Sequence, residues 1–271
     1  MNTYIEKIRN LTRVLSRCWQ QRTPVSCIAI LVASVPSGLS WAGVEDRHVP
    51  TADQWRFNVS VGDRTLGTHS FSKLPTDSGG YEINSRADFE ARVLFVKAFE
   101  YRHRSNEQYQ HGCLQALESR TVTGGDRFQV AAEPAGPAQL RVTAIAGSDS
   151  GDAAQLLSGC LMSFAYWDKR ILEQEALLNS QTGELVPVQI QPGEVALYNG
   201  VEAQAYDLVS AGTAAEPMTI RIWYAQSTGR WVGLESELEN GRTLRYELAL
   251  PDLASAGYGP TLYPMQSGTA Q

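Results

Sequence analysis

Apolar and polar side chains alternate with a period of two along most of the chain between residues 55 and 250. In the first such run Trp55 and Phe57 alternate with polar residues, which is the pattern of a strand buried on one face. Turn residues separate the runs. Gly124 and Gly125, for example, suit a hairpin because glycine takes a positive φ without a steric cost. The spacing predicts about ten to twelve consecutive antiparallel strands.

The expected strands occupy residues 55–61, 65–71, 81–86, 89–107, 114–121, 127–132, 140–144, 185–190, 203–209, 218–224, 231–238 and 243–250. In the second run, Leu66 and Thr68 are expected on the buried side, with Phe71 as a further candidate. A meander of this length either curls into a barrel or stays an open, strongly twisted half-barrel whose inner face needs a cover. The fold class expected is therefore mainly β, a long antiparallel meander that forms a curved half-barrel or open barrel.

One stretch, residues 158–183, breaks the alternation. Its apolar residues, which include Leu161 and Phe164, recur at helix-like spacings. The pattern predicts an apolar plug of about one or two turns and a short helix, spanning about 158–179, that covers or fills the curved sheet. Asp168 is placed to cap the start of this helix.

Residues 1–42 have the features of an export signal. Five basic residues and one acidic residue accompany an apolar run at 25–35, which is too short for a permanent membrane span. Small residues at Ser40 and Ala42 predict cleavage after Ala42 and a periplasmic mature protein. The alternative is an uncleaved N-terminal anchor, since the basic region is long. The expected organisation is a signal peptide (1–42), a lead-in (43–54), a single β-rich domain (55–250) and a loosely ordered tail (251–271).

Removal of the signal changes the charge balance. The whole chain has 23 basic and 29 acidic residues, and the signal holds 5 and 1 of them, so 18 and 28 remain and the net charge becomes about −10. Clusters of Lys and Arg bind nucleic acids and anionic membranes, and no basic run remains after cleavage. Neither nucleic acid nor an anionic membrane surface is therefore expected as the main partner, and no stable membrane span is expected after cleavage.

Two of the four cysteines, Cys113 and Cys160, remain in the mature chain. In an oxidising compartment they predict a disulfide, and two cysteines alone do not make a metal site. The bond would close a loop of about 48 residues, stabilise the fold by about 4 kcal/mol and tie the plug to the sheet. The alternative is that Cys160 is a nucleophile, which requires a base and an electropositive setting.

Candidate catalytic groups are few. His103, Glu107 and His111 lie close together in the sequence and support an alternative in which the protein is a hydrolase or isomerase. His103 and Glu107 share a strand face but are about 13 Å apart along it, too far to hold a small ion without another strand. No nucleophile elbow, phosphate-binding glycine loop or dinucleotide fingerprint is present. No catalytic residue, metal or cofactor is therefore expected, and the expectation leans away from an enzyme.

Aromatic residues gather in the plug stretch and again late in the chain. Phe164, Tyr166, Trp167, Trp223 and Trp231 are the candidates for contact with an apolar ligand. The alternative is that these side chains simply form the core.

Several short motifs resemble a family of exported Gram-negative bacterial proteins known only as a domain of unknown function. The motifs are Gly112-Cys113-Leu114, residues 163–167 and 177–184, Ile222-Trp223-Tyr224, residues 231–235, and Arg245-Tyr246. The resemblance covers residues 55–250 approximately, implies no established activity and transfers no catalytic residue. The layout is more distantly similar to the curved-sheet periplasmic carriers of lipid or lipoprotein, a likeness of fold alone.

The leading hypothesis is an exported periplasmic protein without enzymatic activity that binds an apolar or lipid-like ligand or helps to maintain the envelope. Two alternatives stay open. One is the hydrolase or isomerase with a site near His103, Glu107 and His111, and the other is a structural interaction module with a packed core. The oligomeric state is not determined by the sequence.

Overall fold

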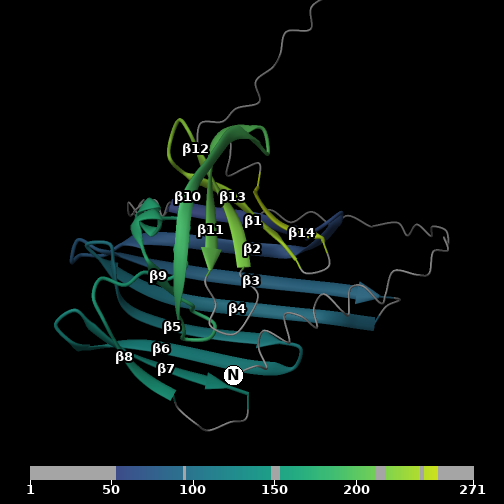
Figure 1. Cartoon of the computed structure of the whole chain (residues 1–271). Coiled ribbons are helices and arrows are strands. Elements are labelled where there is room, and N and C mark those ends of the chain that lie inside the picture. The colour runs from purple at the N-terminus through teal and green to yellow at the C-terminus, as the bar shows by residue number, and fades with distance from the viewer. Residues whose placement is uncertain (1–52, 94–95, 148–152, 211–217, 239–240, 250–271) are drawn as a thin grey trace, which may run out of the picture.

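The computed structural model describes residues 53–93, 96–147, 153–210, 218–238 and 241–249. Fourteen strands in these residues form one sheet (Figure 1). Their bounds are β1 Asp53–Val61, β2 Arg64–Pro75, β3 Tyr81–Val93, β4 Val96–Gln110, β5 Cys113–Thr123, β6 Asp126–Gly136, β7 Gln139–Ala146, β8 Ala153–Ser158, β9 Ala176–Leu178, β10 Leu185–Tyr198, β11 Val201–Ser210, β12 Met218–Ala225, β13 Trp231–Glu237 and β14 Thr243–Leu248. One 3-10 helix, η1 (Lys169–Glu173), precedes β9. With five residues, η1 does not have the length of a membrane-spanning helix, and the described residues hold no other candidate.

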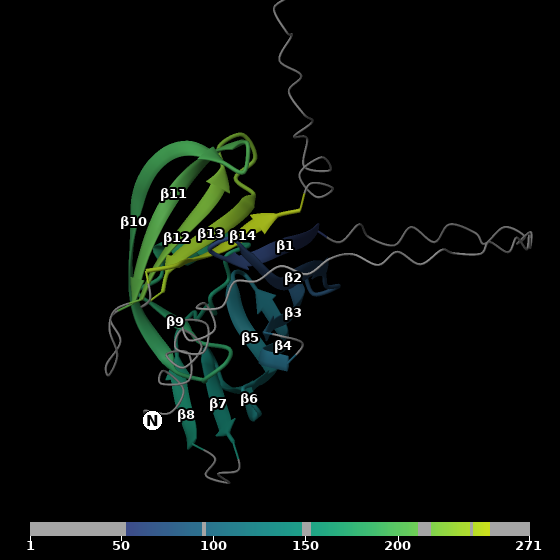
Figure 2. The same cartoon turned by 90° about the vertical axis from the view of Figure 1, so that its right-hand side faces the viewer.

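The strand order explains how the sheet curves. Strands β1 to β8 follow one another side by side, and β9 to β14 do the same in the other half of the sheet. The two halves join where β1 pairs with β14, which places Phe57 opposite Leu248. The chain crosses from β8 to β9 through residues 159–175, which we call the plug, so β8 and β9 are the two edges of the sheet. In Figure 2 the two halves curve towards each other around this crossing.

The two edges of the sheet meet through a turn. The Gln155 side chain on β8 donates a hydrogen bond to the Gly183 carbonyl between β9 and β10, and Ser119 Oγ on β5 donates to the Ser180 carbonyl. A Cβ atom on Gly183 would lie 2.9 Å from the Cβ of Ala144, so glycine allows this turn to approach the sheet closely. The sheet is therefore an open one whose edges are bridged by side chains, and the prediction of a mainly β, curved, open architecture is confirmed.

The core lies between the inner face of the sheet and the plug. Its largest fully buried side chains are Trp231, Tyr224, Phe57, Ile83, Leu117, Met162, Ile171, Leu177, Leu178, Leu208, Ile222 and Leu248. Burying one such side chain stabilises a fold by about 1.5–3 kcal/mol. Met162 and Ile171 belong to the plug, so this segment fills the inner face of the sheet as expected.

The plug is less helical than its sequence predicts. Asp168 caps η1 as expected, since its side chain accepts a hydrogen bond from the Arg170 backbone N–H at 3.1 Å. The helix ends at Glu173, and Ala176–Leu178 forms strand β9 against β10. The expected helical segment of about 158–179 is therefore helical only at Lys169–Glu173, because residues 159–168 contain turns and bends and pairing at the sheet edge replaces the helix after Glu173.

Several strands differ from the sequence-based boundaries, and β10, for example, continues to Tyr198 where the expected strand ends at residue 190. Residues 81–86 and the start of 89–107 form one continuous strand, β3, and the chain reverses only after Val93. Strand β8 was not expected, because its sequence Ala-Ala-Gln-Leu-Leu-Ser has neither alternation nor the β-branched and aromatic residues that favour strands.

A bulge between β1 and β2 changes which side chains face the core. The register shifts after Val59, which leaves Leu66 as an extra residue in β2. Beyond the bulge His69 and Phe71 face inward, whereas Thr68 is exposed. The expectation that Thr68 is buried is therefore wrong, because the extra residue Leu66 shifts the inward and outward positions after it by one.

The export signal, the cleavage site after Ala42, most of the lead-in and the C-terminal tail lie outside the described residues. These assignments, and the domain boundaries that depend on them, stay predictions.

Candidate ligand-binding site on the inner face of the sheet

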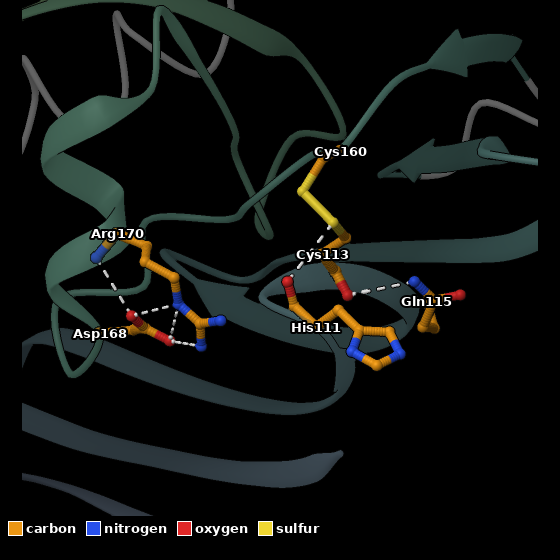
Figure 3. Close-up of a disulfide and its surroundings, with 6 residues drawn as sticks. All are labelled: His111, Cys113, Gln115, Cys160, Asp168 and Arg170. Atoms are coloured by element: carbon orange, nitrogen blue, oxygen red, sulfur yellow. Dashed lines mark hydrogen bonds and ion pairs between the residues drawn. A yellow bond between two sulfur atoms is a disulfide. The ribbon is translucent and has the colours of Figure 1, made fainter. Parts of the chain in front are cut away.

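A disulfide fixes the start of the plug to the sheet. Cys113 at the start of β5 is bonded to Cys160, with their Cα atoms 4.8 Å apart, which confirms the predicted pairing (Figure 3). One residue further along each segment, the Leu114 N–H donates to the Leu161 carbonyl at 2.8 Å. The plug is therefore attached to β5 by a covalent bond and by a backbone hydrogen bond.

A buried carboxyl group makes the second attachment. Glu107 Oε2 on β4 accepts hydrogen bonds from Ser163 Oγ in the plug at 2.6 Å and from the Tyr109 hydroxyl at 2.7 Å. Ser105 Oγ reaches Oε1 of the same carboxyl group at 3.4 Å. Burial raises the pKa of Glu107, although hydrogen bonds from the three hydroxyls act in the opposite direction. We call Ser105, Glu107, Tyr109 and Ser163 the Glu107 clasp.

Asp168 makes a third attachment next to η1. Its carboxylate accepts hydrogen bonds from the Tyr81 hydroxyl at 2.8 Å and from Arg170 Nε at 2.9 Å, and the contact with Arg170 is drawn in Figure 3. Burial alone would raise the pKa of Asp168, but the hydrogen bonds from Arg170 and Tyr81 outweigh it and the pKa is lowered. Tyr81 also stacks on Tyr109 at 5.0 Å between ring centroids, so this attachment adjoins the Glu107 clasp.

Four of the five predicted aromatic residues lie together at the plug. Tyr166 packs against Trp231 on β13 at 5.3 Å and against Phe164 at 6.2 Å between ring centroids. Trp167 packs against Phe71 on β2 at 5.5 Å. Trp167 and Trp231 are only 9% and 1% exposed, whereas Phe164 and Tyr166 are half-buried. The two tryptophans are therefore core residues, and the two remaining rings leave part of their surface accessible.

Trp223 is separated from this group. Its neighbours Ile222 and Tyr224 face the core, so Trp223 points to the opposite face of β12, as side chains alternate along a strand. There it stacks on Tyr198 at 5.1 Å between ring centroids. The structure therefore does not bring Trp223 into one site with the other four residues.

A second group of rings lies on the inner face of the sheet. We call His69, Phe89, Tyr101, His103 and Tyr246 the aromatic–histidine cluster. Phe89 stacks on Tyr101 at 5.2 Å and meets Tyr246 edge-on at 6.3 Å, while the His69 ring lies 5.7 Å from Tyr246 and 6.5 Å from His103. Only His103 is fully buried, and the other four are partly accessible. The five residues come from strands β2, β3, β4 and β14. No local sequence motif therefore predicts the cluster.

Both histidines of the cluster are held without charge at neutral pH. His69 Nε2 lies 2.7 Å from Ser85 Oγ, and His103 Nδ1 lies 2.8 Å from Thr121 Oγ1. Burial holds the pKa of His69 well below 6.5, with a further contribution from His103, and burial lowers the pKa of His103 to about 4. Ala87 on β3 pairs with both residues and separates their rings. The cluster therefore offers apolar ring surface together with uncharged hydrogen-bonding groups.

The plug is connected to this cluster through the rings of Trp231 and Phe57. The Tyr224 hydroxyl donates to the Tyr166 carbonyl at 2.8 Å, which positions the Tyr166 backbone over β12. Burial raises the pKa of the Tyr166 hydroxyl, and the neighbouring hydroxyl of Tyr246 raises it further. Tyr166 packs against Trp231 at 5.3 Å, Trp231 against Phe57 at 4.1 Å, and Phe57 against Tyr246 at 6.0 Å between ring centroids. Packed rings therefore connect the plug to the cluster.

The residues of the alternative catalytic site are not brought together. The His103 ring is hydrogen-bonded to Thr121, and Glu107 is occupied by its clasp. His111 is an exposed residue with a φ of 51° in the turn beside the disulfide (Figure 3). Among the residues that the structure describes, no group of three or more His, Cys, Asp or Glu side chains is placed to hold a metal ion.

An open curved sheet filled by a plug, with an uncharged ring surface beside it, defines an all-β protein of barrel-like architecture. The chain belongs to the family described as "Domain of unknown function (DUF6134)", which matches residues 57–249. The resemblance to a family of unknown function is thereby confirmed.

One similar solved structure supports the architecture. It is the crystal structure of a beta-barrel-like protein of domain of unknown function DUF1849 from Brucella abortus, with a TM-score of 0.53 and 11% sequence identity. The similarity covers 73% of this chain and 95% of that chain. At this identity the likeness concerns the fold alone. Comparison with curated proteins finds no match.

Proposed function

We propose that the protein is an exported periplasmic protein that binds an apolar, lipid-like molecule, without chemical turnover, in a role that maintains the envelope. The observation that carries this proposal is the accessible ring surface on the inner face of the sheet. Phe164 and Tyr166 of the plug and Tyr246, Phe89 and Tyr101 of the sheet are all only partly buried, and packed rings of Trp231 and Phe57 connect Tyr166 to Tyr246. Large rings of this kind supply most of the contact area in sites for apolar ligands.

The charge state of the surface favours an apolar ligand over an anionic one. His69 and His103 are uncharged at neutral pH because burial lowers their pKa values. Their hydrogen-bond partners, Ser85 and Thr121, are also uncharged. Such groups suit the neutral polar end of an amphipathic molecule, while the rings suit its hydrocarbon part.

The periplasmic location is argued from two features. The N-terminal segment has the pattern of an export signal, and the disulfide between Cys113 and Cys160 is of a kind that persists in oxidising compartments. A lipid-like ligand is available in the envelope, which makes a binding role there coherent.

The proposal is tested by titrating the full chain with N-phenyl-1-naphthylamine, a neutral apolar probe that fluoresces when it leaves water. The double variant Phe89→Ser/Tyr101→Ser removes two partly buried rings, and we expect a loss of about 1–2 kcal/mol, or roughly 5- to 30-fold weaker binding. Leu197→Ser is the matched control, because Leu197 is 76% exposed on β10. The proposal fails if the wild-type chain does not bind the probe, or if the control weakens binding as much as the double variant.

A further inference from the structure

A row of arginines crosses the outer face of the sheet. Arg56 on β1 pairs with Ser70 on β2, and Ser70 pairs with Arg86 on β3. Arg86 pairs with Arg104 on β4, and Arg104 pairs with Arg120 on β5. These five positions form one straight line across strands that lie side by side in Figure 1, and at a strand spacing of about 4.8 Å the line is about 19 Å long. We call it the arginine row.

The arginine row is exposed to solvent and mostly without ionic partners. All four arginines are exposed, because their neighbours along each strand face the core. Arg86 pairs with Asp88 at 2.7 Å. The side chains of Arg56, Arg104 and Arg120 make no ion pair or hydrogen bond within the ranges that the structure describes. Like charges that face each other across strands destabilise a sheet, so this arrangement has a cost in the isolated protein.

A second charge row in the same sheet shows the contrasting arrangement. Asp207, Arg221, Glu235 and Arg245 pair directly across β11, β12, β13 and β14, and their charges alternate. Arg221 lies 2.7 Å from Asp207, and Arg245 lies 2.7 Å from Glu235. Charges opposite each other on the outer face are thus compensated in this second row, whereas the arginines that face one another in the arginine row carry like charges.

The residues beside the arginine row limit the kind of partner that fits it. Acidic residues flank the row, namely Glu82 and Glu118 on one side and Asp88, Glu90 and Glu100 on the other, where the exposed Arg102 pairs with Asp88 across the strands and forms an ion pair with Glu100. The uncompensated basic surface is therefore narrow and bordered by carboxylates, which does not suit the broad phosphate contacts of a nucleic acid duplex. Strands β2, β3 and β4 are paired on both edges, so no peptide strand can add to the sheet there.

We propose that the arginine row docks the protein on the surface of an anionic phospholipid membrane. The row presents four guanidinium groups on the outer face of the sheet, and three of them, on Arg86, Arg104 and Arg120, lie on adjacent strands. Guanidinium groups bind phosphate oxygens in a bidentate geometry, which suits lipid headgroups. The net charge of the whole chain is −6, so the remaining surface is repelled and the row fixes which face turns to the membrane.

This inference goes beyond the proposed ligand site, which lies on the opposite face of the sheet. It also departs from the expectation that an acidic chain without a basic run avoids anionic membranes. The row cannot be recognised in the linear sequence, because its successive positions lie 14 to 18 residues apart and only the strand register aligns them.

The test is co-sedimentation of the full chain with vesicles of phosphatidylglycerol and phosphatidylcholine, against vesicles of phosphatidylcholine alone. In the double variant Arg104→Gln/Arg120→Gln we expect roughly 10- to 30-fold weaker binding to the anionic vesicles at low salt, since one arginine near such a surface contributes roughly five-fold. The control Arg64→Gln/Arg141→Gln removes the same charge from two exposed arginines outside the row and should change binding less than about two-fold. Thermal unfolding should show the row variant to be at least as stable as the wild type, because like charges have been removed.

The inference is overturned by any of three results. The first is that the wild type shows no preference for anionic vesicles. The second is that the two double variants bind as the wild type does or lose binding equally. The third is that soluble polyglutamate binds the row while the vesicles do not. Equal binding by all three proteins would assign membrane contact to the basic N-terminal segment. None of these results depends on the naphthylamine titration, so the two proposals fail separately.

Discussion

Ser163 Oγ in the plug lies 2.6 Å from Glu107 Oε2 on β4, and both residues are buried. This contact connects segments 56 positions apart and joins the inside of the sheet to the segment that fills it. The Glu107 clasp therefore determines how the plug sits beside the proposed ligand surface.

Replacing Ser163 by Ala should lower the free energy of unfolding by about 1–3 kcal/mol, because it removes a donor from a buried carboxyl group. Urea unfolding at pH 7 measures this change. Ser78→Ala is the control, since Ser78 is exposed in the turn before β3 and its loss should be small. Equal stability of Ser163→Ala and the wild type would contradict the importance of the clasp.

Glu107→Gln should make stability less dependent on pH above the unfolded value near 4.5. Because burial raises the pKa of Glu107 in the folded state, its contribution is complete below the unfolded pKa and is lost as pH rises through the folded pKa. Glutamine carries no charge and escapes this loss. Urea unfolding from pH 5 to pH 8 should show a smaller fall for the variant than for the wild type, and parallel curves would refute the assignment.

His103 should affect the pH dependence of stability in the opposite direction to Glu107. Burial lowers its pKa from 6.5 to about 4, so its contribution is complete above pH 6.5 and is lost as pH falls towards 4, by roughly 3 kcal/mol at most. His103→Asn should reduce the loss of stability between pH 7 and pH 5. His111→Asn, at an exposed turn where asparagine tolerates the positive φ, should keep the wild-type slope.

Loss of the disulfide should destabilise the fold by about 4 kcal/mol, because the bond closes a loop between residues 47 positions apart. The variant Cys113→Ala/Cys160→Ala should unfold at a lower urea concentration. The double variant and the reduced wild type should then have the same midpoint of urea unfolding. An unchanged midpoint in both would show that the other attachments hold the plug without the bond.

The strand pattern is predictable from the sequence because a period of two records which face of each strand is buried. The prediction of inward and outward positions fails where a bulge interrupts a strand. Leu66 is an extra residue that reverses the inward and outward positions after it, and this places His69 rather than Thr68 on the inner face. Leu177 and Leu178 are equally compatible with a helix, and pairing with β10 makes them a strand.

The candidate site is less predictable than the fold because strand register assembles it. Tyr246 and His69 are 177 positions apart, yet Tyr246 Oη lies 3.4 Å from His69 Nδ1 through the pairing of β1 with β2 and β14. The disulfide was predictable, since only two cysteines follow the predicted signal segment. Trp223 belongs to the same aromatic class as Trp231, and only its parity in β12 places it on the other face.

The central claim, that the inner face binds a lipid-like molecule, is tested most directly by native mass spectrometry of the chain purified without detergent. We expect an adduct of lipid mass that is lost in Phe89→Ser/Tyr101→Ser and retained in Leu197→Ser. After delipidation, the wild-type chain should take the adduct up again from added lipid. A wild-type chain that carries no adduct, and accepts none after delipidation, would contradict the claim.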